Sequence, residues 1–188
     1  MQVNNKMKTV LVPLAQGCEE LEAVTITDLL TRAGIEVITA GLDEQPVVAS
    51  RGLTILPQVR IEEIADKMFD MVVLPGGLPG ANHLRDNQML QNIIIKHAKN
   101  DRYLAAICAA PKALLHAGVL KNKTLTCYPG ALQGQDLQGS KISGTALEID
   151  GKVITSRGPG TAMDFALALI ELLVDKSKKD EVEQGLVR

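Results

Sequence analysis

The sequence has few aromatic side chains and little net charge. Its 188 residues include no tryptophan, two tyrosines and two phenylalanines, although 46% of the residues are hydrophobic. The core must therefore be built from aliphatic side chains, mainly Val, Ile, Leu and Ala. The formal net charge is −2, so the chain offers no basic field to attract nucleic acid or an anionic membrane surface.

Metal-binding patterns and long apolar runs are lacking as well. The three cysteines, Cys18, Cys108 and Cys127, form no CxxC pair, and the three histidines are not clustered, so we expect no metal and no other cofactor. No apolar run is long enough to span a membrane. The polar residues 1–8 lack the apolar core of a signal peptide. We therefore expect a cytoplasmic protein with reduced thiols.

Strand-like and helix-like segments alternate along the chain. Apolar runs predict strands at 9–15, 36–40, 71–74, 104–108 and 124–127, and turn signals predict hairpins at 47–56 and 145–156. Helices are expected at 19–33, 61–67, 79–85, 87–99, 111–117, 161–174 and from 176 onward. Such alternation predicts a single α/β domain, 1–188, with a mostly parallel sheet covered by helices on both faces.

Cys108 lies where an apolar strand changes directly into a helix. Small alanines surround it, and Pro111 suits the first turn of the helix that follows. A strand-to-helix turn can hold a nucleophile above a sheet, and the helix N-terminus is expected to favour the thiolate. The alternative is that Cys108 is one more small buried residue, since free cysteine is often buried.

Two other turns follow strands of the same predicted sheet. They are Gly17–Glu22 and Pro75-Gly76-Gly77, and the carboxyl ends of parallel strands share one edge with the site of ligand binding. The backbone N–H groups of Gly77 and Ala109 could stabilise an oxyanion. Alternatively, the two glycines only make a tight turn.

Glu22 lies one turn into the first predicted helix, near the same edge. A carboxyl group that is partly buried beside a cysteine has a raised pKa, and it could carry a proton during the reaction. Glu19 and Glu20 compete for this role, although solvated charge at a helix start explains those two better.

A Ser-Arg pair occurs at two predicted strand ends and places Arg51 and Arg157 there. Arginine binds carboxylate, phosphate or oxidised sulfur, while an ordinary surface ion pair is the alternative. No histidine is placed to complete a catalytic triad. We expect structural or surface roles for all three, which are His83, His97 and His116.

Four motifs, taken together and in order, resemble the ThiJ/PfpI superfamily. They are Gly17-Cys-Glu-Glu-Leu-Glu22, Leu74-Pro-Gly-Gly77, Ala105-Ala-Ile-Cys108-Ala-Ala-Pro111 and Thr155-Ser-Arg-Gly-Pro-Gly-Thr161. Within that superfamily, the chain is most similar to the branch of the parkinsonism-associated deglycase and the bacterial protein and nucleotide deglycases. The resemblance runs from about residue 8 to 187.

The resemblance implies a flavodoxin-like sandwich that forms a homodimer and uses no cofactor. It implies Cys108 as nucleophile, Glu22 as a protonated carboxyl against its sulfur, and the N–H groups of Gly77 and Ala109 as oxyanion or sulfinate donors. Arg51 and Arg157 match arginines near the pocket and the dimer interface of that family.

The sequence departs from the family pattern at Tyr128, which stands where relatives carry a histidine proposed as a proton carrier. Tyrosine is a poor base at neutral pH, because its reference pKa is about 10. Glu22 therefore becomes the expected proton carrier, and Tyr128 is left as a hydrogen-bond donor. Ala109 occupies the position where peptidases of the superfamily carry histidine, which disfavours a peptidase.

The leading interpretation is a deglycase or glyoxalase. It would act on methylglyoxal- or glyoxal-derived adducts of proteins and nucleotides and release lactate or glycolate. A redox-sensing stress protein or chaperone that uses an oxidisable Cys108 is the alternative. An amide or acyl hydrolase is a third interpretation.

Overall fold

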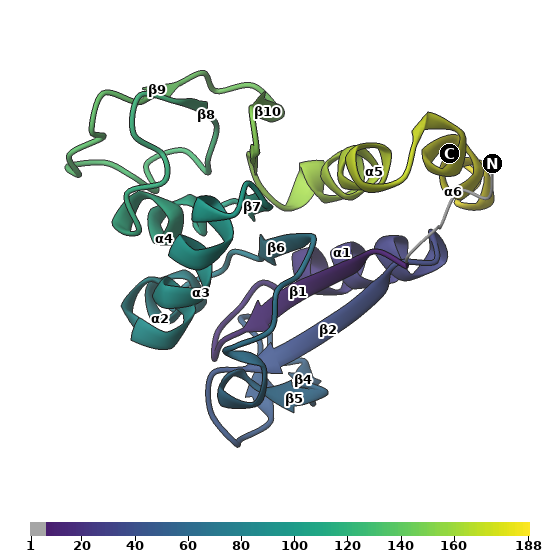
Figure 1. Ribbon diagram of the computed structural model, residues 1–188, viewed down its shortest axis with the longest axis horizontal. Coiled ribbons are helices and arrows are strands. Elements are labelled where there is room, and N and C mark those ends of the chain that lie inside the picture. The colour runs from purple at the N-terminus through teal and green to yellow at the C-terminus, as the bar shows by residue number, and fades with distance from the viewer. Residues whose placement is uncertain (1–6) are drawn as a thin grey trace.

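A computed structural model describes residues 7–188 and shows a seven-stranded sheet with helices on both faces (Figure 1). The strands are β1 (Thr9–Leu14), β2 (Glu36–Gly41), β3 (Val47–Val48), β4 (Thr54–Ile55), β5 (Val59–Arg60), β6 (Met71–Leu74), β7 (Tyr103–Ile107), β8 (Thr124–Leu125), β9 (Lys141–Ile142), β10 (Leu147–Asp150) and β11 (Val153–Ser156). The helices are α1 (Glu20–Arg32), α2 (Gly80–Asp86), α3 (Gln88–Lys99), α4 (Pro111–His116), α5 (Ala162–Leu173) and α6 (Lys176–Gly185).

The sheet has the strand order β10-β11-β7-β6-β1-β2-β5. All neighbouring strands pair in parallel except the β10–β11 hairpin. The chain steps from β1 to β2 on one side and then returns to β6 on the other side of β1. This order is flavodoxin-like, and it opens a crevice between the carboxyl ends of β1 and β6, where α/β proteins bind ligands.

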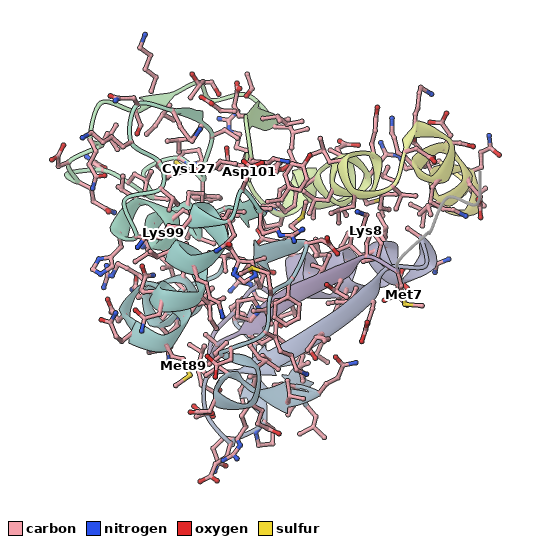
Figure 2. The ribbon with its side chains drawn as sticks, in the orientation of Figure 1. Met7, Lys8, Met89, Lys99, Asp101 and Cys127 are labelled. Atoms are coloured by element: carbon pink, nitrogen blue, oxygen red, sulfur yellow. The ribbon has the colours of Figure 1, made fainter. Side chains whose placement is uncertain are left out.

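The sheet separates two aliphatic cores. Val10 and Val12 of β1 point to the core shared with α1 and α5, whereas Leu11 points to the core shared with α3 and α4. The same alternation occurs on β6 and β7, as expected for strands whose successive side chains face opposite sides. Side chains fill the space between the sheet and its helices (Figure 2). The predicted mostly parallel sheet with helices on both faces is confirmed.

The element predictions fail at a few short segments. The strand expected at 124–127 ends at Leu125, because Thr126 turns its backbone N–H to the side-chain oxygen of Thr155 at 2.9 Å. The helix expected at 61–67 is one 3₁₀ turn, Ile61–Ile64. β5 and β9 have only two residues each, too short to leave a pattern in the sequence.

Residues 1–6, on which the signal-peptide expectation partly rests, lie outside the described part of the chain. Within residues 7–188, no helix combines the length and the apolar character needed to cross a bilayer. In the same range, no three side chains of His, Cys, Asp or Glu gather in a way that could hold a metal ion.

His97 supports the fold rather than a reaction. It is fully buried, its Nε2 accepts a hydrogen bond from Phe69 N–H at 3.0 Å, and its Nδ1 lies 2.8 Å from the Ile93 carbonyl. This pair of contacts requires the neutral ring with its proton on Nδ1. Burial lowers the pKa of His97, which keeps that form at neutral pH.

We expect His97→Leu to lower the free energy of unfolding by about 1–3 kcal/mol, because Phe69 N–H would be buried without an acceptor. Urea denaturation near neutral pH measures the loss. His116→Leu, at an exposed position, is the matched control and should change stability little. Equal stabilities of wild type and His97→Leu would contradict the structural role.

Candidate active site

Three loops meet at the carboxyl ends of β1, β6 and β7. Gly76, after β6, accepts a hydrogen bond from Glu19 N–H at 2.9 Å and donates one to Glu22 Oε2 at 2.8 Å. A methyl group at position 76 would lie 2.6 Å from the Cys108 Cβ atom and 2.8 Å from Glu22 Oε2. Glycine is therefore required at position 76, and its backbone fits between the thiol residue and the carboxyl residue.

Cys108 occupies the turn between β7 and α4 in a left-handed conformation, with φ of 62°. That conformation is uncommon for residues with a side chain and is maintained only when the surroundings fix it. Here the Cys108 N–H donates to the Ser156 carbonyl at 2.9 Å, and its carbonyl accepts from Tyr128 N–H at 2.8 Å. The backbone is thus held on both sides, as predicted for a nucleophile at a strand-to-helix turn.

The Glu22 carboxyl is completely buried on α1. Its Oε1 has no hydrogen-bond partner among the described residues, while Oε2 accepts from Gly76. Burial raises the pKa of Glu22 to about 7, although the Gly76 N–H and the Cys108 thiol act in the opposite direction. A carboxyl with this pKa gains and releases a proton near neutral pH, which is what a proton carrier requires.

The thiol of Cys108 experiences opposing influences. Burial and the nearby Glu22 carboxylate raise its pKa, whereas the backbone N–H groups of Gly77 and Ala109 lower it as hydrogen-bond donors. The net effect is a raised pKa of the Cys108 thiol. The expected preference for the thiolate is therefore wrong when Glu22 is ionised. α4 has only six residues, and its partial charge does not outweigh burial and the carboxylate.

The carboxyl and the thiol therefore behave as one coupled pair. Two negative charges in contact are unfavourable, so the pair holds one proton over a wide pH range. When the proton is on Glu22, the repulsion that raises the pKa of Cys108 disappears, and the two N–H donors stabilise the thiolate. The pair thus has two states, the thiolate beside a protonated Glu22 and the thiol beside an ionised Glu22.

A cavity of about 450 Å³ gives access to Cys108, which is 8% exposed. Gly77, Ala109 and Tyr128 contribute to its wall, and Arg51 and Lys112 supply positive charge. Lys112 was not singled out from the sequence. Its position in the first turn of the helix that follows Cys108 is the signal that could have identified it.

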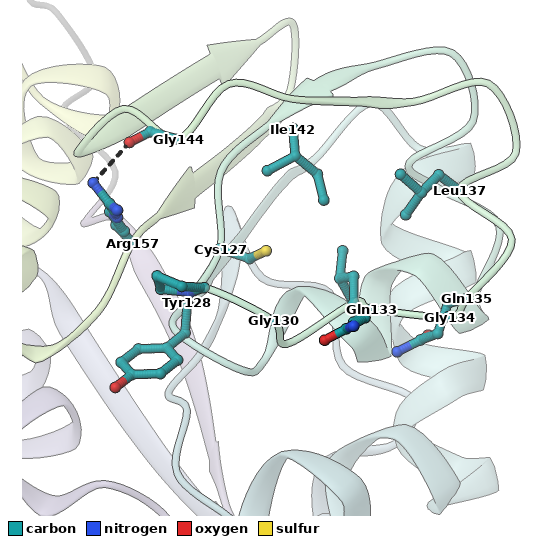
Figure 3. A pocket seen from close by; sticks show the side chains of 12 residues that line it. Cys127, Tyr128, Gly130, Gln133, Gly134, Gln135, Leu137, Ile142, Gly144 and Arg157 are labelled. Atoms are coloured by element: carbon teal, nitrogen blue, oxygen red, sulfur yellow. Dashed lines mark hydrogen bonds between the residues drawn. The ribbon is translucent and has the colours of Figure 1, made fainter.

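Arg157 does not line this cavity. Its guanidinium donates to the Gly144 carbonyl at 3.0 Å and borders a second cavity, of about 570 Å³, together with Cys127 (Figure 3). Tyr128 lines both cavities, and its ring points away from the Cys127 sulfur. The sequence analysis treated Arg51 and Arg157 alike, as residues that bind anions or lie at an interface. In the structure the two arginines line different cavities.

The acidic residues at the start of α1 take different places. Glu20 accepts hydrogen bonds from Arg51 N–H at 2.9 Å and from Ser50 Oγ at 3.1 Å, so it fixes the turn between β3 and β4. Desolvation of Glu20 is outweighed by these and other hydrogen bonds, which lower its pKa. Glu20 is therefore partly exposed charge at the helix start, as expected, and in addition it holds the β3–β4 loop, which helix-start composition did not indicate.

Cys18 is fully buried and lines neither cavity. Burial and the charge of Glu20 raise its pKa to about 11. Both facts fit an inert small residue at a close approach of two loops, and they speak against a second reactive thiol.

Comparison with known proteins places this geometry in a family. The profile of the DJ-1/PfpI family matches residues 8–172. The chain belongs to the DJ-1/PfpI family. It is 41% identical over 181 residues to Protein dj-1beta of Drosophila melanogaster, with 96% of this chain and 97% of that protein covered.

A second relative carries a name that describes chemistry. The glutathione-independent glyoxalase DJR-1.2 of Caenorhabditis elegans is 32% identical over 181 residues, with 96% of both chains covered. Among solved structures, that of Drosophila melanogaster DJ-1beta superimposes with a TM-score of 0.90 at 40% identity, over 97% of this chain and 98% of that one. The DJ-1/PfpI family thus includes a glyoxalase.

The buried carboxyl predicts a pH dependence of stability. The folded-state pKa of Glu22, about 7, lies above its ordinary value of 4.5. Its contribution to stability is therefore fully present below the ordinary value and is lost as pH rises through about 7. Glutamine cannot ionise, and it can still accept from Gly76 N–H.

We expect Glu22→Gln to gain stability relative to wild type when the pH is raised from about 4.5 to about 8. Urea denaturation of both proteins at several pH values measures this difference, in which titrating groups that do not contact Glu22 cancel. Glu44→Gln, at an exposed position, should follow wild type. A constant difference between wild type and Glu22→Gln would show that the buried carboxyl does not titrate in this range.

Proposed function

We propose that this protein is a cofactor-free, cysteine-dependent glyoxalase and deglycase. Its substrates are methylglyoxal, glyoxal and their early adducts on proteins and nucleotides, and its products are lactate or glycolate. The observation that carries the proposal is the buried Glu22 carboxyl, whose pKa is close to neutral, in contact with the only cysteine that opens into the 450 Å³ cavity within residues 7–188. The glyoxalase among the relatives supports the same chemistry.

The reaction begins when the Cys108 sulfur attacks the aldehyde carbon. With a free aldehyde, the C=O π electrons move to oxygen, the oxygen takes the proton of Glu22, and a hemithioacetal forms beside the Glu22 carboxylate. With an adduct, the bond between that carbon and the carrier nitrogen or sulfur breaks, and the carrier leaves as a free amine or thiol. The N–H groups of Gly77 and Ala109 lie beside the sulfur, where they can stabilise the developing oxyanion.

Glu22 then moves a proton between adjacent carbons. As a carboxylate it removes the hydrogen from the former aldehyde carbon, and as an acid it returns a proton to the neighbouring carbon. The first carbon is oxidised and the second is reduced, so no external oxidant is needed. Water hydrolyses the resulting thioester, which releases the hydroxy acid and restores the thiol.

Tyr128 takes no proton in this scheme. Its side chain is 51% exposed at the wall of the cavity, and its backbone holds the Cys108 carbonyl. The phenol can donate a hydrogen bond to a bound substrate. The proton transfers of the reaction thus depend on Glu22 alone.

The redox-sensing or chaperone role is the weaker candidate. The two N–H donors beside the sulfur could hold a sulfinate as well as an oxyanion. However, a redox sensor requires an accessible thiol of low pKa, and Cys108 is 8% exposed with a raised pKa.

Lactate release from methylglyoxal-treated N-acetylcysteine or N-acetylarginine tests the function. We expect wild type to be active, Cys108→Ser to lose activity, and Glu22→Gln to lose about 10²-fold or more. Cys127→Ser is the matched control for a buried cysteine outside this cavity and should stay active. Tyr128→Phe should retain most activity.

An inactive wild type whose Cys108 is verified as reduced would overturn the enzyme proposal. Full activity of Cys108→Ser would overturn the mechanism. Preferential oxidation of Cys108 by mild peroxide in an inactive wild type would favour the redox role instead.

We also propose that the protein forms a homodimer through α1 and the β3–β4 hairpin. Leu21 and Val24 on α1 are 50% and 48% exposed, and Val48 and Leu53 of the hairpin are 51% and 49% exposed. Glu20 bonds this hairpin to the start of α1, so these apolar side chains belong to one surface. Exposed apolar surface of this kind marks an interface.

Introducing charge at this surface should separate the subunits. We expect Val24→Glu to shift the sedimentation equilibrium of a dimeric wild type toward the monomer. Ile149→Glu, which changes a similarly exposed apolar residue on β10, should remain dimeric. A monomeric wild type at micromolar concentration would reject this proposal.

A further inference from the structure

Lys112 is a buried cation in the wall of the Cys108 cavity. It lies on α4, it is only 8% exposed, and it lines the cavity together with Cys108 and Ala109. Burying an ammonium group costs free energy unless hydrogen bonds or an opposite charge compensate it. What compensates Lys112 therefore shows which ligand the cavity is built to hold.

The only hydrogen bond that Lys112 Nζ makes within residues 7–188 is to a neutral group. It donates to the Asn82 Oδ1 atom of α2 at 2.9 Å, and it forms no ion pair in the described structure. An ammonium has three N–H donors. The other two make no hydrogen bond to the protein within residues 7–188.

The nearest acidic group on α2 is already engaged. Asp86 accepts two hydrogen bonds from Arg85, at 2.6 and 2.8 Å. The Lys112 ammonium therefore shares its electrostatic surroundings with an Arg–Asp pair rather than with a free carboxylate. Burial, and then the charge of Arg85, lower the pKa of Lys112, whereas Asp86 and the Cys108 thiolate act in the opposite direction. A bound anion would add to that opposing effect.

The rest of the cavity has a mixed rim. Glu19 lines it and accepts a hydrogen bond from Ser50 Oγ at 2.9 Å. Arg51 lies on the same rim, exposed, and within residues 7–188 its guanidinium donates only to the Ser50 carbonyl. Arg51 and Glu19 thus carry opposite charges at the rim, and Lys112 is a second cation in the wall that Cys108 also lines.

We infer that Lys112 makes the Cys108 cavity selective for negatively charged substrates, namely aldehydes or adducts that carry a carboxylate or a phosphate group beside the reacting carbonyl. This inference rests on the proposed function for its catalytic consequence. The binding consequence is independent, because Lys112 and Cys108 line the same cavity whether or not the proposed reaction takes place there.

Alkylation of Cys108 tests the binding consequence without enzyme activity. Iodoacetate and iodoacetamide react with the same thiolate and differ in charge, so the ratio of their rates cancels any change in the pKa of Cys108. Each rate is followed by mass spectrometry of the peptide that contains Cys108. We expect Lys112→Gln to lower the iodoacetate-to-iodoacetamide ratio about fivefold.

Matched variants separate the role of Lys112 from general charge. Lys112→Arg should keep the ratio of wild type, and Lys99→Gln, at an exposed position, should leave it unchanged. Lys112→Met keeps the apolar stem and should also lower the ratio. It replaces Lys112→Gln in the test if the glutamine variant folds poorly. High salt should lower the ratio in the wild type itself, since it screens the ammonium.

Substrate competition tests the catalytic consequence. Methylglyoxal adducts are prepared on three thiol carriers: neutral 2-mercaptoethanol, 3-mercaptopropionate and 2-mercaptoethyl phosphate. The wild type should prefer one or both anionic carriers in kcat/KM by about fivefold, and Lys112→Gln should lower this anionic-to-neutral ratio of kcat/KM to about one. The two anionic carriers show whether carboxylate or phosphate is the group preferred.

The two proposals fail in different ways. An alkylation ratio that is the same in wild type and Lys112→Gln, or that does not respond to salt, overturns the role of Lys112. If none of the three adducts yields lactate, the proposed reaction is overturned. Anion selection still stands in that case if the iodoacetate-to-iodoacetamide ratio depends on Lys112 and on salt.

Discussion

The position of Gly76 is the constraint on which the site depends. Its backbone donates to the Glu22 carboxyl, accepts from Glu19, and leaves no room for a side chain against Cys108. These contacts join the loops after β1, β6 and β7 at the crevice where the strand order reverses. The fold brings the three strand ends to one edge of the sheet. Because Gly76 has no Cβ atom, the loops that follow these strands can come into contact there.

This contact makes the chemistry of Cys108 inseparable from that of Glu22. A buried carboxyl with one oxygen lacking any partner is stable with a proton on it, and a thiol beside a carboxylate is stable as the thiol. In the proposed reaction, reactivity therefore arises from the transfer of one proton between the two groups. The helix N-terminus, which first suggested an activated thiol, is a secondary influence.

Much of the fold could be predicted from the sequence, because the strands of the main sheet are continuous apolar runs bounded by turn residues. β1, β6 and β7 were located to within a residue or two, and the β10–β11 hairpin was indicated by Asp150-Gly151. The two-residue strands β5 and β9 were not predicted, since their pairing depends on contacts far away in the chain. The turn at Thr126 escaped for the same reason, because the side chain of Thr155 decides it.

The site was predicted in part. Strand-end position indicated Cys108, Gly77 and Glu22, since that inference needs only topology. The direction of the thiol pKa could not be read, because it depends on how deeply the pair is buried. Lys112 and the use of Glu20 as a loop anchor likewise depend on side-chain packing, which a linear pattern does not contain.

The donors beside the Cys108 sulfur belong to the main chain of Gly77 and Ala109, and their direction is set by backbone conformation rather than by residue identity. The cavity entrance, in contrast, is made of side chains on three separate segments, represented by Arg51, Lys112 and Tyr128. The two parts can therefore diverge independently. Exchange of a few entrance residues would change which molecules are admitted, while the reacting geometry is inherited intact from the fold.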